Sequence, residues 1–259
     1  MITIHEHEIS PTIFPDGTSQ VWHLPKELEH IRGTTVNVVW TFENEAEFMH
    51  ILQLSDLLKN CFEVKVNLTM PYLPYARQDK DISNEETFAL RTLLKTLKLF
   101  VDNISVFDPH SDVYKEWFEE GVAISPESSI AGARVRSNAD MICYPDKGAS
   151  KRYSSFLDKY NSVSMEKVRN KHTGEITGLK FSDDSVELQD KKVLIVDDLC
   201  DGGRTFIEAA KLLYTKGAYT VNLYVSHGIF SKGLDILHQN GIIKVFTKDG
   251  LVSEKVSNE

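Results

Sequence analysis

The sequence lacks an apolar run long enough for a membrane-spanning helix, and its first eight residues lack the pattern of a signal peptide. We therefore expect a cytoplasmic protein with no membrane partner. Cysteine is also scarce, with 3 residues among 259, all far apart in the chain. Because their spacing fits no metal-ligand motif, we expect reduced thiols rather than a disulfide framework or a zinc site.

Basic residues are outnumbered, with 29 Lys and Arg against 38 Asp and Glu and a net charge of −9. Nonspecific nucleic-acid binding depends on phosphate neutralisation by basic side chains, so we expect no nucleic-acid partner. The sequence also contains neither a Walker A loop nor a G-x-G-x-x-G loop, which argues against those two modes of phosphate binding. The remaining composition, 41% hydrophobic and 26% charged, is typical of a globular protein.

Strand and helix patterns alternate along the chain. The expected strands cover 36–40, 64–70, 104–107, 139–144, 193–196, 221–226 and 242–246; the expected helices cover 45–60, 85–99, 151–160, 206–216 and 233–240. This alternation is typical of parallel α/β sheets and predicts two similar halves joined near residues 122–135. Residues 161–190 break the pattern, and we expect a basic β-arm or mobile loop there.

The segment 193–205, Val-Leu-Ile-Val-Asp-Asp-Leu-Cys-Asp-Gly-Gly-Arg-Thr, is the most informative stretch. Its four aliphatic residues indicate a buried strand, and Asp197 and Asp198 follow at the carboxyl end, where ligands bind in open α/β sheets. The turn 201–205 leads into a helix amino terminus, whose N–H groups attract anions. An ordinary strand with a surface turn would explain the aliphatic residues and glycines, but not three acids. Such carboxylates suit sugar hydroxyls or Mg²⁺, and the segment resembles the sugar-phosphate motif of phosphoribosyltransferases and phosphoribosyl diphosphate (PRPP) synthetases.

Four further segments resemble PRPP synthetases in order and spacing. They are Thr-Ile-Phe-Pro-Asp-Gly at 12–17, Pro-Tyr-Leu-Pro-Tyr-Ala-Arg-Gln-Asp at 71–79, Asp-Pro-His-Ser at 108–111 and Tyr-Pro-Asp-Lys-Gly at 144–148. Such collinear matches identify the chain as a short, divergent relative of the ribose-phosphate pyrophosphokinase family. The resemblance implies an α/β fold of two similar type I phosphoribosyltransferase-like domains, each a mainly parallel sheet flanked by helices. Residues 1–127 would form the ATP side and 128–259 the ribose-phosphate side.

The resemblance also implies a role for each matching residue. The ATP-binding residues would be Phe14 and Asp16, which reach adenine from a neighbouring subunit, together with Arg77, Gln78 and Asp79. The residues implied to bind the ribose phosphate are Asp197, Asp198, Asp201, Gly202, Gly203, Arg204 and Thr205. His110 and Asp146 would contact the metal, and the implied catalytic residues are His110, Lys167 and Arg169, the last two on a closing arm.

The implied activity is a Mg²⁺-dependent transfer of the β,γ-diphosphate of ATP to the C1 hydroxyl of ribose 5-phosphate, giving PRPP and AMP in a homodimer or higher homo-oligomer. One departure concerns the acceptor: Arg204 stands in a loop that usually reads Asp-Thr-Gly-Gly-Thr. It suggests either a local variation or a larger acceptor such as ADP-ribose, which would place the enzyme in NAD metabolism. A PRPP-consuming transferase needs no ATP segment, and a catalytically silent regulatory homologue needs no Lys167 and Arg169.

Overall fold

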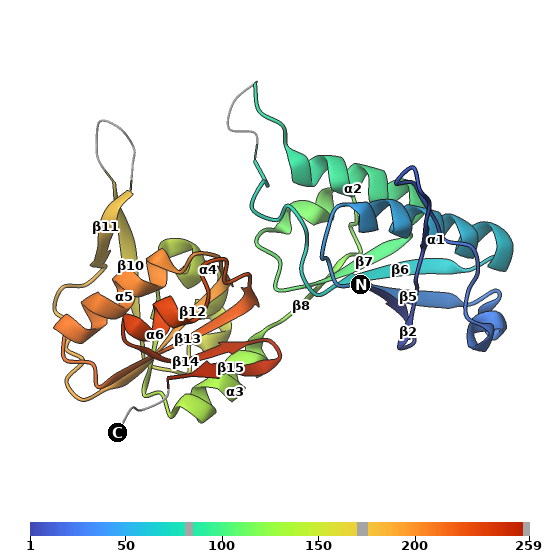
Figure 1. Cartoon of the computed structure of the whole chain (residues 1–259). Helices are drawn as coiled ribbons and strands as arrows, with labels where there is room; N and C mark the ends of the chain where they lie inside the picture. The colour runs from blue at the N-terminus through green and yellow to red at the C-terminus, as the bar shows by residue number, and fades with distance from the viewer. Residues whose placement is uncertain (81–84, 170–175, 256–259) are drawn as a thin grey trace. The chain divides into compact units, whose positions relative to one another are not determined.

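The computed structural model describes residues 1–80, 85–169 and 176–255 (Figure 1). The chain divides into two compact units, unit 1 from Met1 to Ile124 and unit 2 from Ser125 to Glu259. No described helix combines the length and apolar character needed to cross a membrane.

Unit 1 is built on a six-stranded sheet with the order β2-β1-β5-β6-β7-β8. Its strands are β1 (Ile2–Ile4), β2 (His7–Glu8), β5 (Thr35–Trp40), β6 (Lys65–Met70), β7 (Asn103–Phe107) and β8 (Val122–Ile124). Strands β5 to β8 are parallel, whereas β1 is antiparallel to both β2 and β5. A separate hairpin joins β3 (Thr12–Ile13) to β4 (Ser19–Gln20).

Two helices, α1 (Ala46–Phe62) and α2 (Ala89–Phe100), contact one another beside this sheet, and two 3-10 helices, η1 (Lys26–Ile31) and η2 (Asp112–Glu116), complete unit 1 (Figure 1). The buried face of α2 consists of Leu90, Leu93, Leu94 and Leu97, at the spacing that puts side chains on one side of a helix. In β5, buried Val36, Val38 and Trp40 alternate with more exposed residues, as a strand covered mainly on one face requires.

Unit 2 contains a seven-stranded sheet with the order β11-β10-β9-β12-β13-β14-β15. Its strands are β9 (Met141–Tyr144), β10 (Ser162–Arg169), β11 (Ile176–Phe181), β12 (Lys192–Cys200), β13 (Thr220–Gly228), β14 (Ile242–Thr247) and β15 (Gly250–Glu254). The five central strands are parallel, and β11 and β15 pair antiparallel at the edges. The helices are α3 (Glu127–Ser137), α4 (Lys147–Leu157), α5 (Arg204–Thr215) and α6 (Asp235–Gln239).

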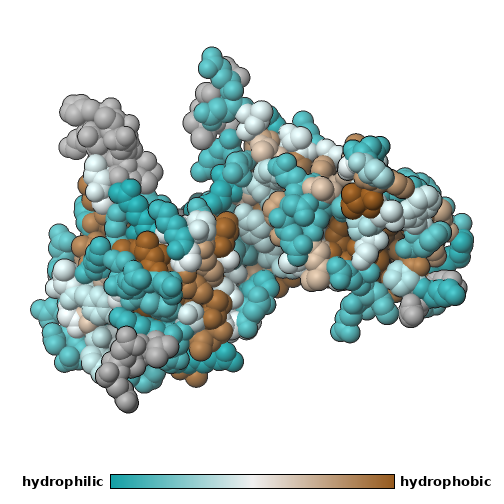
Figure 2. Space-filling model, in the orientation of Figure 1, coloured by the Kyte–Doolittle hydropathy of each residue, from teal (hydrophilic) through white to brown (hydrophobic). Residues whose placement is uncertain are grey.

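Strand β12 separates two hydrophobic layers of unit 2. Leu194 and Val196 pack with residues of α3 and α4, whereas Val193 and Ile195 pack with residues of α5 and α6. Both faces of the strand are therefore covered, which explains its continuous aliphatic sequence. Hydrophilic residues cover most of the face that Figure 2 shows.

The prediction of mainly parallel sheets flanked by helices is confirmed. The two units divide between Ile124 and Ser125, within the stretch 122–135 where the join was expected. This stretch contains β8 and most of α3, whose Ile130 and Ala133 lie in the core. The helix predicted from residue 151 begins at Lys147, since Asp146 caps it, and the helix predicted from residue 85 begins at Ala89. The arm predicted at 161–190 contains the antiparallel β10–β11 hairpin, with residues 170–175 outside the described part.

Candidate active site

Two carboxylates lie near the carboxyl end of β12, a buried central strand of unit 2. Alternation along β12 places Asp198 on the α3–α4 face, with Leu194 and Val196, and Asp197 on the α5–α6 face. Asp197 is only 8% exposed and Asp198 only 2% exposed, and the Asp198 N–H donates to Asp197 Oδ1 over 2.9 Å. Burial raises the pKa of Asp197 well above its usual value, and the charges of Asp198 and Asp146 raise it further.

Arg152 on α4 is the countercharge of this pair, and the sequence analysis missed it. Its Nη1 lies 3.0 Å from Asp198 Oδ1 and 3.8 Å from Asp197 Oδ1. The signal was indirect: Arg152 stands six residues after Asp146, on the helix that follows the strand beside β12. The guanidinium and the carboxylates meet for two reasons: β9 and β12 are neighbouring strands, and the alternation of side chains along β12 turns Asp198 toward α4.

The β10–β11 hairpin carries the predicted arm residues. Lys167 on β10 reaches Asp146, with Nζ 2.6 Å from Oδ2, while Asp146 Oδ1 accepts from the Ala149 N–H at the start of α4. Burial acts to raise the pKa of Asp146, but the hydrogen bonds from Lys167 and Ala149 bring it below the usual value. Arg169 is the last residue of β10. The structure therefore joins the arm lysine to the predicted metal-side carboxylate.

The predicted phosphate loop, residues 201–205, forms the turn between β12 and α5. Gly203 caps the helix with φ +76°, and a Cβ there would approach Leu237 Cδ2 to 2.7 Å, so this position requires glycine. The Arg204 side chain is 79% exposed and pairs with Glu208 over 2.9 Å. Lys232, also exposed, packs its Cε 3.5 Å from the place of a Cβ on Gly202. Two cations thus border the loop, and Lys232 was not predicted.

The predicted nucleotide segments of unit 1 follow two neighbouring parallel strands. Residues 71–79 follow β6 and residues 108–111 follow β7, and Met70 pairs with Val106. Parallel strands end at the same edge of a sheet, so the structure brings these two segments together. Asp79 is buried and His110 is half-buried, whereas Arg77 and Gln78 are exposed.

The predicted adenine loop lies on the separate β3–β4 hairpin, which α1 holds in place. His50 Nε2 is 2.9 Å from Ser19 Oγ, and Gln53 hydrogen-bonds the backbone of β4. Phe14 is half-buried, with its ring edge-on to Trp22 at 6.2 Å between centroids. Exposed Asp16 accepts hydrogen bonds from the Thr18 side chain and N–H, which lower its pKa.

The donor chemistry of unit 2 fits a hard divalent cation. Among residues 1–80, 85–169 and 176–255, no group of three or more His, Cys, Asp or Glu side chains is arranged to enclose an ion. Mg²⁺ needs no such cage, because it keeps several waters and is bound through one or two carboxylates plus substrate phosphates. Asp146, whose carboxylate influences Asp197, supplies a donor of this kind.

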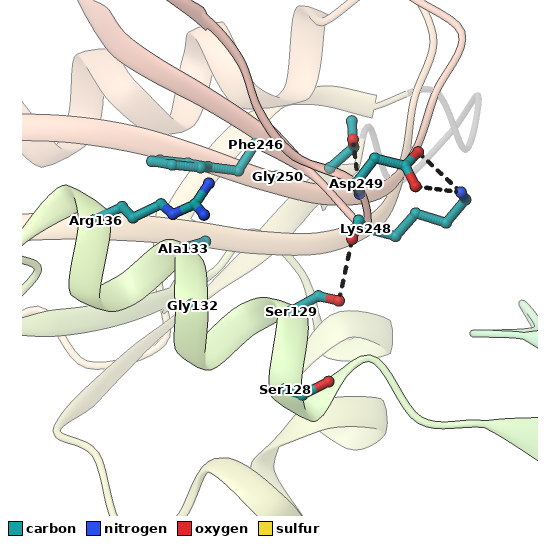
Figure 3. A pocket seen from close by; sticks show the side chains of 10 residues that line it. Ser128, Ser129, Gly132, Ala133, Arg136, Phe246, Lys248, Asp249 and Gly250 are labelled. Carbon is teal, nitrogen blue, oxygen red and sulfur yellow. Dashed lines mark hydrogen bonds and ion pairs between the residues drawn. The ribbon is translucent and has the colours of Figure 1, made fainter.

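A pocket of about 230 Å³ lies elsewhere in unit 2, between α3 and the β14–β15 hairpin (Figure 3). Arg136 and Phe246 line it, and Lys248 at its rim pairs with the adjacent Asp249. Ser129 Oγ donates to the Lys248 carbonyl over 3.3 Å. The residues lining this pocket include none of the predicted site residues.

Comparison with known proteins gives matches in both units. Residues 2–100 match the N-terminal domain of ribose phosphate pyrophosphokinase, and residues 156–250 match the phosphoribosyl transferase domain. The ribose-phosphate pyrophosphokinase of Pyrococcus abyssi is 31% identical over 227 residues, covering 85% of this chain and 76% of the relative. That of Sulfurisphaera tokodaii is 26% identical over 255 residues, covering 95% and 86%.

One solved structure shares the whole fold. The phosphoribosylpyrophosphate synthetase from Mycobacterium smegmatis superposes with a TM-score of 0.76 at 23% identity, covering 92% of this chain and 78% of that one. At this level of identity, the match bears on the architecture: two α/β units with mostly parallel sheets.

Proposed function

Because the chain belongs to the ribose-phosphate pyrophosphokinase family of enzymes, we propose that it transfers the β,γ-diphosphate of ATP to the C1 hydroxyl of ribose 5-phosphate, giving PRPP and AMP. The observation that carries this proposal is the buried Asp197–Asp198 pair on β12, the strand that leads into a glycine turn at the amino terminus of α5. The carboxylate pair suits the hydroxyl groups of a sugar diol, and the glycine turn suits a phosphate.

Unit 2 would bind the acceptor. Charged carboxylates accept hydrogen bonds from hydroxyl groups, so Asp197 and Asp198 would hold the two ribose hydroxyls. The N–H groups around Gly202, Gly203 and Thr205 would surround the 5-phosphate at the positive end of the α5 dipole. The two contacts together would fix the direction in which C1 points. Unit 1 would bind ATP through the segments that contain Arg77, Gln78, Asp79 and His110.

Diphosphate transfer has a loose transition state with spread charge, so catalysis rests on positioning and electrostatic stabilisation. Lys167 and Arg169 would meet that charge from the β10–β11 hairpin. Lys167 must then exchange Asp146 for substrate oxygens, since its ammonium pairs with that carboxylate. His110 and Asp146 would each offer a donor to Mg²⁺, which would supply charge neutralisation and phosphate alignment.

The test is whether the protein releases AMP from Mg²⁺–ATP in the presence of ribose 5-phosphate, with the AMP measured by chromatography. Lys167→Ala should fold normally yet turn over about 100-fold more slowly or worse, the typical cost of a lost transition-state contact. Lys180→Ala is the matched control, because Lys180 lies opposite Glu166 in the strand register of the same hairpin and its side chain is exposed. Equal rates for both variants would remove Lys167 from the mechanism.

A second candidate acceptor is ADP-ribose, whose C1 would undergo the same reaction. The supporting observation is the pair of exposed cations, Arg204 and Lys232, at the border of the loop. A diphosphate extends beyond the loop and offers a second phosphate group for them to bind. AMP release with ADP-ribose that falls in Arg204→Ala and Lys232→Ala favours this acceptor. A strong preference for ribose 5-phosphate excludes it.

We also propose a homo-oligomer in which the Phe14 loop of one subunit serves the nucleotide site of another. Mixing Phe14→Ala with Lys167→Ala tests this arrangement, because one subunit would supply the intact loop and the other the intact arm. Recovered activity after mixing and refolding supports shared sites. Additive residual activity means that each chain supplies its own Phe14.

A further inference from the structure

We propose that Arg152 is a positioning residue for the sugar acceptor, holding the Asp197–Asp198 pair in place so that its oxygens meet a vicinal diol. This inference rests on the proposed function and deepens it. It concerns an α4 residue to which neither the sequence motifs nor the proposed chemistry gives a role. The juxtaposition that carries it is a mostly buried guanidinium against two buried carboxylates.

Arg152 balances the charge of the two carboxylates. The side chains of Asp197 and Asp198 are 11% and 3% exposed, and that of Arg152 is 19% exposed. Two adjacent carboxylates removed from water repel one another and lose hydration, which is costly unless a cation compensates. Arg152 supplies that cation, with Nη1 3.0 Å from Asp198 Oδ1 and 3.8 Å from Asp197 Oδ1. A guanidinium stays charged throughout the physiological pH range.

Arg152 also determines the direction in which the carboxylate oxygens point. Asp198 points to the α4 face of β12, so its Oδ1 is the oxygen that Arg152 engages. Arg152 also contacts its neighbour in the chain, since the same Nη1 lies 3.5 Å from Tyr153 Oη and the guanidinium lies 5.5 Å from the Tyr153 ring centre. A charged donor held against a tyrosine ring restricts the rotation of the carboxylate that it contacts. The remaining oxygens of the pair therefore keep a defined direction toward a ligand.

Helix α4 connects the two ion pairs of the site. Asp146 caps the start of α4, and Arg152 stands on the same helix, about 9 Å further along its axis at 1.5 Å per residue. One helix thus carries the partner of Lys167 at its end and the partner of Asp198 within it. A displacement of α4 would disturb both contacts. The rigid helix accordingly ties the acceptor carboxylates to the arm.

The experiment compares Arg152→Gln and Arg152→Lys with wild type. Binding of ribose 5-phosphate, or of ADP-ribose if only that supports AMP release, is measured by calorimetry without ATP, alongside the KM of acceptor and of ATP. Arg152→Gln should weaken acceptor binding about 10-fold or more, the usual effect of losing a hydrogen bond to a charged group. The KM of ATP should change less than about twofold. Arg152→Lys should recover part of the affinity, because it keeps the charge but not the planar fork.

Folding is monitored by circular dichroism and thermal melting, because Arg152→Gln leaves two buried carboxylates without their cation. If that variant does not fold, Arg152→Lys carries the test, because it keeps the cation beside the two carboxylates. A folded variant with unchanged acceptor affinity, or with acceptor and ATP constants altered equally, overturns the proposal. Wild-type protein that releases no AMP with either acceptor instead overturns the proposed function, so the two failures are distinguishable.

Discussion

Ion pairs connect the proposed acceptor residues of unit 2, whereas several proposed nucleotide residues of unit 1 stand on loops with exposed side chains. Lys167 and Arg152 contact their carboxylates at 2.6 and 3.0 Å. Arg77 and Gln78 are exposed, and the Asp16 carboxylate bonds within its own turn. The sugar side is therefore organised before a ligand arrives, while much of the nucleotide side gains its contacts from the ligand.

Organisation of this kind has a physical consequence. Buried charged groups depend on one another, so removing one partner affects both fold and binding. Exposed loop residues contribute little to stability, so their loss affects binding alone. Variants of the two units should therefore separate into two classes, which the following substitutions test.

Asp198→Asn should have the largest effect, because it removes the carboxylate 3.0 Å from the mostly buried Arg152 and leaves only that of Asp197, at 3.8 Å. We expect loss of measurable acceptor binding and a decrease of about 3 kcal/mol in the free energy of unfolding, the typical cost of breaking a buried pair. Calorimetry and urea unfolding measure the two quantities. An unchanged free energy of unfolding would contradict the internal countercharge.

Gly203→Ala should come next. Its φ of +76° and the 2.7 Å approach of Leu237 to the added Cβ make alanine strained and crowded, at a cost of about 2 kcal/mol in the free energy of unfolding. Gly132→Ala is the control, because a Cβ there meets nothing within 4 Å and the position is helical. Equal melting temperatures for the two variants would mean that the loop adapts freely.

Arg77→Ala tests the other unit. Since its side chain is exposed, the free energy of unfolding should change by less than about 0.5 kcal/mol. The KM of ATP should rise about 10-fold through loss of a charged hydrogen bond, while the KM of the acceptor stays constant. Initial-rate kinetics at varied ATP and acceptor separate these effects. A large loss of stability would show that the nucleotide side is also organised by internal charge pairs.

Asp146→Asn should lower stability less than Asp198→Asn or Gly203→Ala, in a way that depends on pH. The folded-state pKa of Asp146 lies below its ordinary 3.8, so its ion pair with Lys167 stabilises the fold above that pH, and the contribution disappears as the pH falls through the folded value. At pH 7 the variant should unfold about 1 kcal/mol more easily. Unfolding curves across the acid range should show that the difference shrinks below pH 3.8. A difference independent of pH would contradict a stabilising role for the ionised Asp146 carboxylate.

Much of the central fold was predictable because local patterns agree with it. The aliphatic run of β12 and the glycine turn before α5 specify a strand, a tight turn and a helix within one stretch. The leucines of α2 fall on one helical face, although its start was placed too early. In these stretches, burial follows directly from the order of residues.

Other features depend on contacts between distant segments. Helix α3 has few apolar residues, and only the packing of Ile130 and Ala133 makes it part of unit 2. Arg152 resembles any exposed helical base until β9 and β12 are known to pair. Lys232 reaches the phosphate loop only because its segment packs on Gly202. Such residues can be assigned only once the topology is known.

The most direct test of the central claim is phosphorus NMR of the purified protein with Mg²⁺–ATP and a ribose phosphate acceptor. The account predicts AMP together with new diphosphate resonances of a sugar substituted at C1, formed in equal amounts. Conversion of ATP to ADP and phosphate, or no conversion with either ribose 5-phosphate or ADP-ribose, would contradict diphosphate transfer by this protein.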